Sequence, residues 1–217
     1  MPIITIRGQM GSGAPEVGRR VADKLGIDYV DREVIAEVAA KLQRQEQEVM
    51  AKEMPPTSVL GRIAEALEHS YAFGDGMAGA YLSMTEIPLE DARYLQALES
   101  VVKELARGRS LVIRGRGSQF ILKNHPEAFH ALVVASLDVR VKRTMEDLKL
   151  DYEAAKLEVT QFDSRLREFI KRYFKAELED SVNYDLVVNT ERLSFEAAAS
   201  IIVDALSCKA RTLRGQN

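Results

Sequence analysis

Cysteine, histidine and tryptophan are scarce in this sequence of 217 residues, which has one cysteine, three histidines and no tryptophan. With Cys208 alone, the chain cannot form an intramolecular disulfide or build a zinc site from cysteines. His69, His125 and His130 lack the spacing of metal ligands, so the sequence predicts no metal site made by protein ligands. We expect packing or surface roles for the histidines, and a packing role for Cys208 on the last helix.

Long apolar runs and a strong net charge are also missing. No stretch approaches about 18 uninterrupted apolar residues, so we expect no membrane span. The first residues, MPIITIRG, do not read as a signal peptide. Lysine and arginine number 30 against 33 acidic residues, a net charge of −3, whereas a dedicated nucleic-acid binder should be basic. The sequence therefore predicts a cytoplasmic globular protein that binds neither nucleic acid nor membrane.

Short β-rich apolar segments alternate with helical patterns along the chain. This alternation predicts an α/β fold, with a five-stranded parallel sheet and helices on both faces. The expected strands are 2–6, 27–30, 110–114, 129–136 and 184–190. The expected helices are one from Pro15 to a cap at Gly26, one at 33–50, one from Thr57, one from Pro88 to Gly108, a basic helical region at 138–175 and a last helix capped by Ser194; a loop is expected at 73–79.

A glycine-rich turn, Gly8-Gln9-Met10-Gly11-Ser12-Gly13, joins the first strand to the first helix. Glycines allow backbone N–H groups to converge on a phosphate, and the helix that follows presents its positive dipole end to the same anion. The P-loop pattern places a lysine and then Ser or Thr after the second glycine, but Ala14 and Pro15 stand there. The turn thus predicts phosphate binding, with a plain strand-to-helix turn as the alternative. Candidates for the missing positive charge are Arg7, Arg19, Arg20 and Arg116.

Four blocks together, GQMGSG, YVDREVI, VIRGRGSQFIL and YDLVVNTERLSFEAA, resemble the cytidylate kinase-like family, a branch of the P-loop nucleoside monophosphate kinases. The resemblance runs from residue 2 to about residue 206. The family's loop reads Gly-Ser-Gly-Gly, matching Gly11 to Ala14, and lacks the lysine too. Gly8 stands where the family carries an arginine, next to Arg7.

The resemblance implies one P-loop kinase-like domain over 1–217. Its parts are a core (1–31, 108–139 and 176–208), a helical lobe for the phosphoryl acceptor (32–107) and a lid (140–175).

Family positions also imply roles for residues at the strand ends. Arg116 matches the family arginine that binds the acceptor's phosphate. The family carries an acid on each side of this arginine, at positions that Arg114 and Gly117 occupy in this chain. Asp31 lies where such kinases place an aspartate against the acceptor, and Arg32 follows it. Asp31 could instead cap the next helix, and Arg114 could be a surface residue at a strand end.

The segment FDSRLR resembles the family's lid block at Asp163 and Arg165. This implies an acceptor contact for Asp163 and a phosphate contact for Arg165, with Arg140 and Arg143 as further lid arginines. The alternative is a solvated charged helix face.

The resulting hypothesis is an ATP-dependent, Mg²⁺-using phosphotransferase that acts on a nucleoside monophosphate, with CMP or dCMP as the first guess, or on a similar small phosphorylated acceptor. Arg116, Arg165 and Asp31 are the predicted catalytic residues, and Asp31, Arg32, Arg116 and Asp163 the predicted acceptor ligands. The donor's phosphates would lie against Gly8, Gly11, Ser12, Gly13 and Ala14. The alternative is a nucleotide-binding sensor or scaffold without transfer activity; a homodimer is possible in either case.

Overall fold

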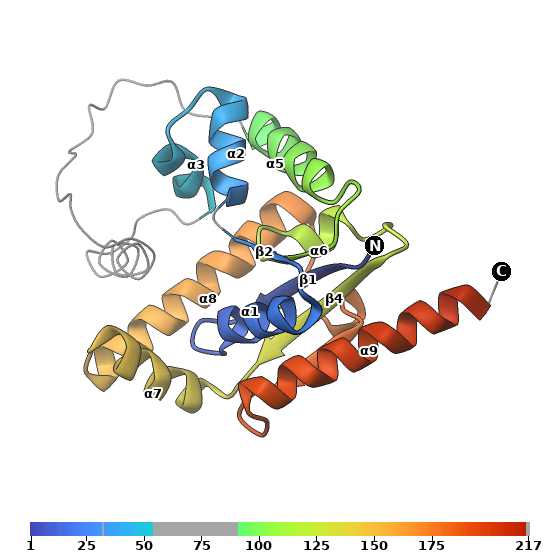
Figure 1. Cartoon of the computed structure of the whole chain (residues 1–217). Helices are drawn as coiled ribbons and strands as arrows, with labels where there is room; N and C mark the ends of the chain where they lie inside the picture. Colours follow the sequence, from blue (N-terminus) through green and yellow to red (C-terminus); the bar gives the residue numbers. More distant parts are fainter. Residues whose placement is uncertain (32, 54–90, 216–217) are drawn as a thin grey trace.

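The computed structural model of this chain describes residues 1–31, 33–53 and 91–215, in which five parallel strands form one sheet (Figure 1). The strand order is β2-β3-β1-β4-β5, with β1 at the centre between β3 and β4. The predicted α/β fold is thereby confirmed, and the strand ends differ from the predicted ones by no more than two residues. The strands are β1 (Ile3–Gly8), β2 (Asp28–Val30), β3 (Leu111–Arg114), β4 (Ala128–Val134) and β5 (Leu186–Asn189).

Helices α1 (Ala14–Leu25) and α9 (Phe195–Gly215) cover one face of the sheet (Figure 1). Ile4, Ile6 and Val112 point to this face and are fully buried against the two helices. The predicted caps are confirmed: Gly26 ends α1 with a φ of 62°, and the Ser194 hydroxyl accepts a hydrogen bond from the N–H of Ala197 in the first turn of α9.

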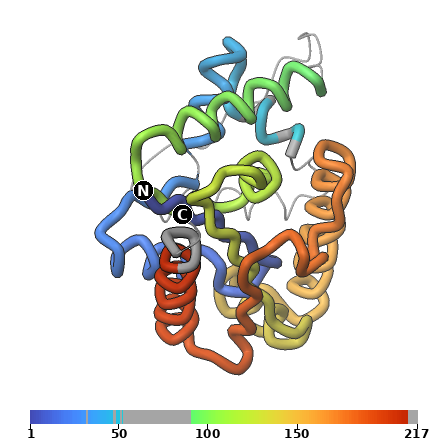
Figure 2. Tube along the Cα trace, turned by 90° about the vertical axis from the view of Figure 1, so that its right-hand side faces the viewer, coloured from blue at the N-terminus to red at the C-terminus, as the bar shows by residue number. Residues whose placement is uncertain are grey.

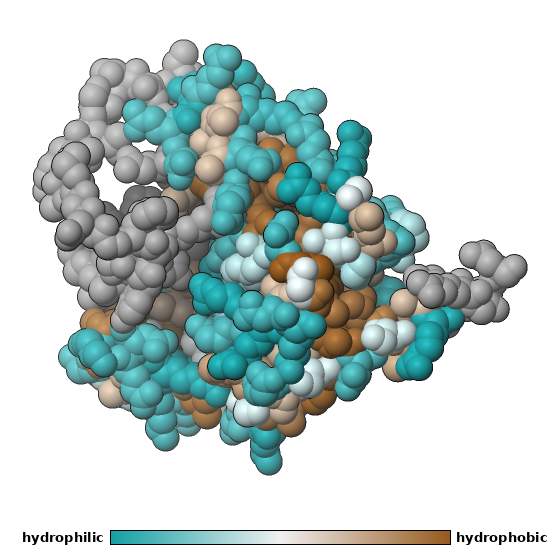
Figure 3. All heavy atoms as spheres, viewed as in Figure 1, coloured by the Kyte–Doolittle hydropathy of each residue, from teal (hydrophilic) through white to brown (hydrophobic). Residues whose placement is uncertain are grey.

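The other face is covered by helices that come from the middle of the chain. Side chains alternate along a strand, so Ile3, Leu111 and Ile113 point to this face. They share a core with α5 (Asp91–Leu105) and α8 (Tyr152–Phe174). In Figure 3, polar side chains cover the outer surfaces of the helices and apolar ones show between them.

Helices α2 (Glu33–Leu42), α3 (Glu46–Glu53) and α5 lie together at one end of the molecule, between β2 and β3 in the sequence (Figures 1 and 2). The Asp91 carboxylate ties this group to α8, because it accepts hydrogen bonds from Lys52 (2.7 Å), Arg172 and the Tyr173 hydroxyl (3.0 Å). These bonds lower the pKa of Asp91 to about 2, with the bond from Lys52 as the largest cause.

Two long helices of the prediction are each broken in the structure. The tract at 33–50 is two helices, because Gln43 adopts a φ of 53° after α2. The basic region at 138–175 divides into α7 (Leu137–Leu148) and α8, because Lys149 adopts a left-handed conformation and Asp151 caps α8 by accepting from the N–H of Ala154.

Smaller differences concern short elements and one side chain. Helix α6 (Ser118–Ile121) and the 3-10 turn η1 (Ser181–Asn183) were not predicted. Cys208 is exposed, so the expectation that it packs is wrong. The helix from Thr57, the loop at 73–79 and the start at Pro88 lie outside the described residues.

Candidate functional site: a glycine-rich loop facing arginines at the strand ends

The glycine-rich loop lies between β1 and α1, at the carboxyl end of the central strand, where open parallel sheets bind ligands. Gly11 and Gly13 adopt φ values of 74° and 80°. A Cβ on Gly11 would lie 2.5 Å from the backbone oxygen of Arg140, and one on Gly13 would lie 2.3 Å from the Phe195 ring. Both positions therefore require glycine for conformation and for space.

Three successive carbonyl groups of the loop are held from outside it. The Met10 carbonyl accepts from Arg140 (3.2 Å), the Gly11 carbonyl from Arg143 (3.3 Å) and the Ser12 carbonyl from the Thr190 hydroxyl (2.6 Å). In a planar trans peptide, the next N–H points away from the carbonyl. The N–H groups of Gly11 and Gly13 are consequently turned to the opposite side of the loop, where an anion would lie.

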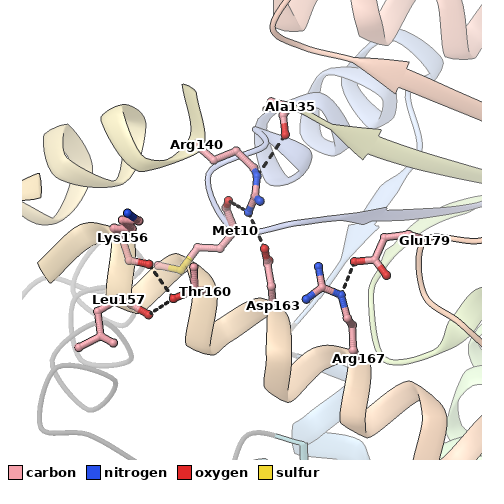
Figure 4. A network of polar contacts seen from close by, with 9 residues as sticks. All are labelled: Met10, Ala135, Arg140, Lys156, Leu157, Thr160, Asp163, Arg167 and Glu179. Atoms are coloured by element: carbon pink, nitrogen blue, oxygen red, sulfur yellow. Dashed lines mark hydrogen bonds and ion pairs between the residues drawn. The ribbon is translucent and has the colours of Figure 1, made fainter. Parts of the chain in front are cut away.

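Arg140 is fixed by a buried ion pair with Asp163, with 2.8 Å between Nη1 and Oδ2 (Figure 4). The side chains are only 6% and 5% exposed. Arg140 also donates from Nε to the Ala135 carbonyl. The pair therefore fastens the loop to α7 and α8, and its burial shields it from solvent.

Arg143 and Thr190 form a second support next to the first. Arg143 donates to the Thr190 hydroxyl (3.0 Å) and carbonyl (2.8 Å), and its guanidinium lies 5.0 Å from the centre of the Phe195 ring. An open cavity of about 410 Å³ begins here. It is lined by Arg143, Thr190, Glu191, Arg192, Leu193, Ser194 and Phe195.

Ser12 is fully buried in the loop, and its hydroxyl makes no hydrogen bond with the described residues. A Cβ on Gly8 would lie 2.4 Å from this hydroxyl and 2.4 Å from the Ala14 Cβ. A side chain at position 8 is thus excluded by the packing of the loop itself.

Arginines gather at the ends of β1 and β3, next to the loop. Arg114 donates from Nε to the Asp31 carboxylate (2.6 Å), so Asp31 closes an ion pair across β2 and β3. Gly115, Arg116 and Gly117 follow with φ values of 71°, 58° and 66°, which turn the chain sharply after the strand.

Arg7, at the end of β1, lies against this turn. A Cβ on Gly115 would lie 2.7 Å from its Nη1. The pKa of Arg7 is lowered to about 9, first by burial and then by the charges of Arg114 and Arg116, which Tyr184 and Asp31 partly offset. Among the described residues, the carboxyl ends of the two strands therefore hold more positive than negative charge.

A sequence profile of the cytidylate kinase-like family matches residues 3–192, which covers most of the chain. The chain belongs to the cytidylate kinase-like family. The predicted resemblance is therefore confirmed. The chain matches the family from β1 to the residues after β5, although its loop carries no lysine.

Curated relatives of the chain are named cytidylate kinases. It is 26% identical to a cytidylate kinase of Fervidobacterium nodosum, over 96% of this chain and 97% of the relative. It is 24% identical to a cytidylate kinase of Staphylothermus marinus, over 93% and 94% of the two chains.

Solved structures confirm the kinase fold. An uncharacterised protein from Eubacterium ventriosum superposes with a TM-score of 0.67 at 19% identity, over 95% of this chain and 99% of that one. A gluconokinase from Sinorhizobium meliloti superposes with a TM-score of 0.52 at 13% identity, over 100% and 97%. A shikimate kinase from Acinetobacter baumannii gives 0.51 at 16% identity, over 96% and 94%. At these identities the likeness concerns the fold alone.

The structure brings some of the predicted site residues together. Gly8 to Ala14 form one loop, and Asp31 and Arg116 lie at neighbouring strand ends beside it. The Asp31 carboxylate pairs with Arg114, so Arg114 is no isolated surface residue. Among the described residues, the Asp31 carboxylate makes no hydrogen bond to the start of α2; instead, the Glu33 carboxylate accepts a hydrogen bond from the N–H of Asp31. Arg32 lies outside the described residues.

The predicted lid residues separate into two groups. Asp163 is engaged with Arg140 below the loop, and Arg140 and Arg143 hold loop carbonyls. Arg165 lies two residues further along α8 and is partly buried. The contacts of Asp163 and Arg165 with an acceptor stay predictions.

Thr190 was missed by sequence reasoning, although a signal for it existed. It follows the last strand directly, at the edge of the sheet where the loop lies. The local pattern does not tell this threonine from others, because its partner Ser12 is 178 residues away in the sequence.

Other features of the described residues lie outside this site. A second cavity of about 580 Å³ is lined by residues in and just after α6, and by residues from the end of α8 through the following segment to η1; none of them belongs to the loop. No three His, Cys, Asp or Glu side chains come together as a metal site in the described part of the chain. Of the described helices, none is long and apolar enough to cross a membrane.

Proposed function

We propose that this protein transfers the γ-phosphoryl group of ATP to a nucleoside monophosphate, with CMP or dCMP as the first acceptor to test. The observation that carries the proposal is the pairing of two features at one sheet edge. The loop turns its N–H groups of Gly11 and Gly13 to one side, and positively charged side chains stand at the adjoining strand ends. Such an edge suits two phosphorylated ligands that meet end to end.

The donor's phosphates are proposed to bind in the loop formed by Gly8, Gly11, Ser12, Gly13 and Ala14. Inward N–H groups and the start of α1 supply hydrogen-bond donors and a positive dipole. The cavity beside Thr190 and Phe195 is proposed to take the base, because it adjoins the loop and its volume falls within the range of ligand pockets.

Magnesium is proposed to arrive bound to the donor's phosphates. The loop offers it no ligand of the P-loop kind, since Ala14 and Pro15 carry no hydroxyl. The Asp31 carboxylate is engaged by Arg114, and no metal-binding cluster is present among the described residues. The described residues therefore do not fit a magnesium site of their own.

The acceptor is proposed to bind with its phosphate at Arg116. A guanidinium can donate two parallel hydrogen bonds to phosphate oxygens, which fixes the direction of the acceptor as well as its charge. Asp31, whose carboxylate already accepts from Arg114, would orient the acceptor, with Arg32 next to it. Arg165 would complete the charge around the transferred group.

The proposed reaction needs little covalent help from the protein. An oxygen of the acceptor's phosphate forms a bond to the γ-phosphorus while the bond to the β,γ-bridging oxygen breaks. ADP leaves, and the acceptor becomes a nucleoside diphosphate. The protein contributes alignment of the two ligands and positive charge around the transferred group.

The helical lobe and the lid region are proposed to serve this chemistry. The lobe at 32–107 would cover the acceptor, and the lid region at 140–175 would approach the phosphates. In the described residues, Asp163 and Arg140 of this lid region already support the loop from below. We propose that Asp163 acts through Arg140 in addition to any contact with the acceptor.

The choice of CMP follows the curated relatives, which are named cytidylate kinases. The lack of an acid at Arg114 and of a hydroxyl at Pro15, together with the missing loop lysine, favours a second candidate, a nucleotide-binding sensor that holds ATP without transferring phosphate. The two functions share the donor site and differ in turnover.

A coupled assay for ADP formation separates them. The protein receives ATP, magnesium and each nucleoside monophosphate in turn, with Arg116→Ala as the comparison. We expect turnover with CMP or dCMP that falls strongly in the variant, while the circular dichroism spectrum stays unchanged. ATP binding without turnover on any acceptor would instead support the sensor.

A further inference from the structure

We propose that Arg7 is a second guanidinium of the acceptor-phosphate site, acting on the same phosphate as Arg116. The proposal rests on the proposed function for the identity of the acceptor. The presence of an anion site at Arg7 follows from the structure and can be tested separately.

The position of Arg7 places it on the acceptor side of the loop. It is the penultimate residue of β1, one residue before Gly8, and its guanidinium reaches towards the end of the neighbouring strand β3. Gly115 makes room for it, since any side chain there would meet Nη1. The N–H of Gly115 donates to the Ile6 carbonyl (3.0 Å), so the turn that carries Arg116 is fastened to the strand that carries Arg7.

The guanidinium of Arg7 has no partner within the described part of the chain. Its Nε is covered from solvent and makes no hydrogen bond, while other parts of the side chain remain accessible. The described carboxylate that acts on it most strongly is Asp31, and that carboxylate is already bonded to Arg114. A covered, unpartnered donor is costly for the fold, which indicates that a ligand satisfies it.

The charges around Arg7 specify the kind of ligand. The positive charges of Arg114 and Arg116 repel the positive charge of Arg7. A bound anion would therefore stabilise the site. A phosphate monoester, with up to two negative charges and three acceptor oxygens, matches two adjacent guanidinium groups. A hydroxyl acceptor would leave this charge unbalanced.

The effect of replacing Arg7 on stability separates a ligand-binding role from a purely structural one. If Arg7 held the fold together, its replacement would lower the melting temperature. Because Arg7 is covered, unpartnered and next to like charges, its replacement by an uncharged residue should raise the melting temperature in the absence of anions.

The test compares wild type with Arg7→Gln, Arg7→Lys and the control Arg109→Gln. Arg109 is exposed and precedes β3, at the opposite edge of the sheet, so its variant removes one positive charge outside the site. Calorimetry measures the binding of inorganic phosphate, CMP and ATP, and thermal unfolding in phosphate-free buffer measures stability. The ADP-formation assay gives KM for each substrate.

We expect Arg7→Gln to weaken binding of phosphate and CMP at least tenfold, to change ATP affinity less than twofold and to raise the melting temperature. Arg7→Lys should give an intermediate loss, because it keeps the charge and loses the fork. Arg109→Gln should match wild type. Unchanged phosphate binding in Arg7→Gln, or a lower melting temperature with ATP and phosphate affinities falling together, would overturn the proposal.

The outcome for Arg7 can be separated from that for the proposed function. If wild type turns over CMP and Arg7→Gln does so with unchanged KM, Arg7 is excluded and the function stands. If no monophosphate is turned over but phosphate binding still depends on Arg7, the anion site stands and the kinase function fails.

Discussion

Arg140 joins Asp163 to the Met10 carbonyl, so a buried ion pair between α7 and α8 reaches the glycine-rich loop directly. The support lies behind the loop, on the side away from its inward N–H groups. In the proposed donor site, this support would therefore control the shape of the loop without touching the ligand. Arg143 and Thr190 do the same for the next two carbonyls.

The ion pair should matter for both stability and donor binding. Replacing Asp163 by Ala leaves the Arg140 guanidinium buried without its carboxylate, which costs about 3 to 5 kcal/mol when such a pair is broken from one side. We expect this loss in urea unfolding, together with weaker ATP binding in calorimetry. Glu168→Ala on the exposed side of the same helix is the matched control and should stay within about 0.5 kcal/mol of wild type. Equal stability of the two variants would contradict this role.

Two glycines with left-handed conformations provide a matched pair for the loop. Gly13→Ala adds both backbone strain and a clash with the Phe195 ring, whereas Gly26→Ala, at a φ of 62° with no atom within 4 Å of its Cβ, adds strain alone. Strain of this kind costs about 1 to 2 kcal/mol. Both variants should lose stability, and Gly13→Ala should also lose ATP affinity. Similar ATP affinities in the two variants would show that the loop tolerates a side chain at Gly13.

The Thr190 hydroxyl should contribute to donor binding through the loop. Thr190→Val removes the hydrogen bond to the Ser12 carbonyl and the bond from Arg143, at a cost of about 1 to 3 kcal/mol for partners left unsatisfied. ATP affinity measured by calorimetry should fall, with acceptor KM little changed. Thr160→Val removes an exposed hydroxyl whose bonds within the described residues go to carbonyls of α8 itself, so it should leave ATP affinity unchanged.

Stability should depend on pH through His130. The pKa of His130 is lowered to about 4, mainly by burial and to a smaller extent by Lys209 and His125, while Asp185 opposes the shift. Between pH 6.5 and about 4 the unfolded chain therefore binds a proton that the folded chain does not, so stability falls as the pH is lowered, by up to about 1.4 kcal/mol per pH unit.

Urea unfolding between pH 6.5 and 5 measures this slope, in a range above the usual titration of carboxyl groups. His130→Gln should flatten it, and His125→Gln, a residue that is only partly buried, should keep it. The comparison uses slopes because His130 also shares a hydrogen bond with the Thr5 hydroxyl (2.8 Å), whose loss lowers stability at every pH. An unchanged slope in His130→Gln would assign the pH dependence to other groups.

Much of the fold could be predicted because its signals are local. Apolar runs of four to eight residues marked the strands, and Pro15, Gly26 and Ser194 marked helix ends with the geometry their chemistry favours. The breaks at Gln43 and Lys149 could not be predicted in the same way. Both residues are good helix formers, yet each adopts the left-handed conformation in which helices commonly end, and helix propensity alone does not indicate it.

The candidate site was only partly predictable, because its geometry joins distant parts of the chain. The loop and Arg116 carry local patterns of glycine and arginine after strands. The support by Arg140, Arg143 and Thr190 depends on partners more than 40 residues apart, as does the pairing of Arg114 with Asp31. Spacing along the sequence does not indicate these contacts, so the sequence alone does not predict which residues are partners.

The central claim, transfer of a phosphoryl group to a nucleoside monophosphate, is tested most directly by following the phosphoryl group itself. ATP labelled in its γ-phosphate is incubated with magnesium, CMP and the protein, and the labelled products are separated, with Arg116→Ala in parallel. The account predicts that label appears in CDP with wild type and is strongly reduced with the variant. Label that stays in ATP, or appears only as inorganic phosphate, with CMP and dCMP and with every other nucleoside monophosphate, would contradict it.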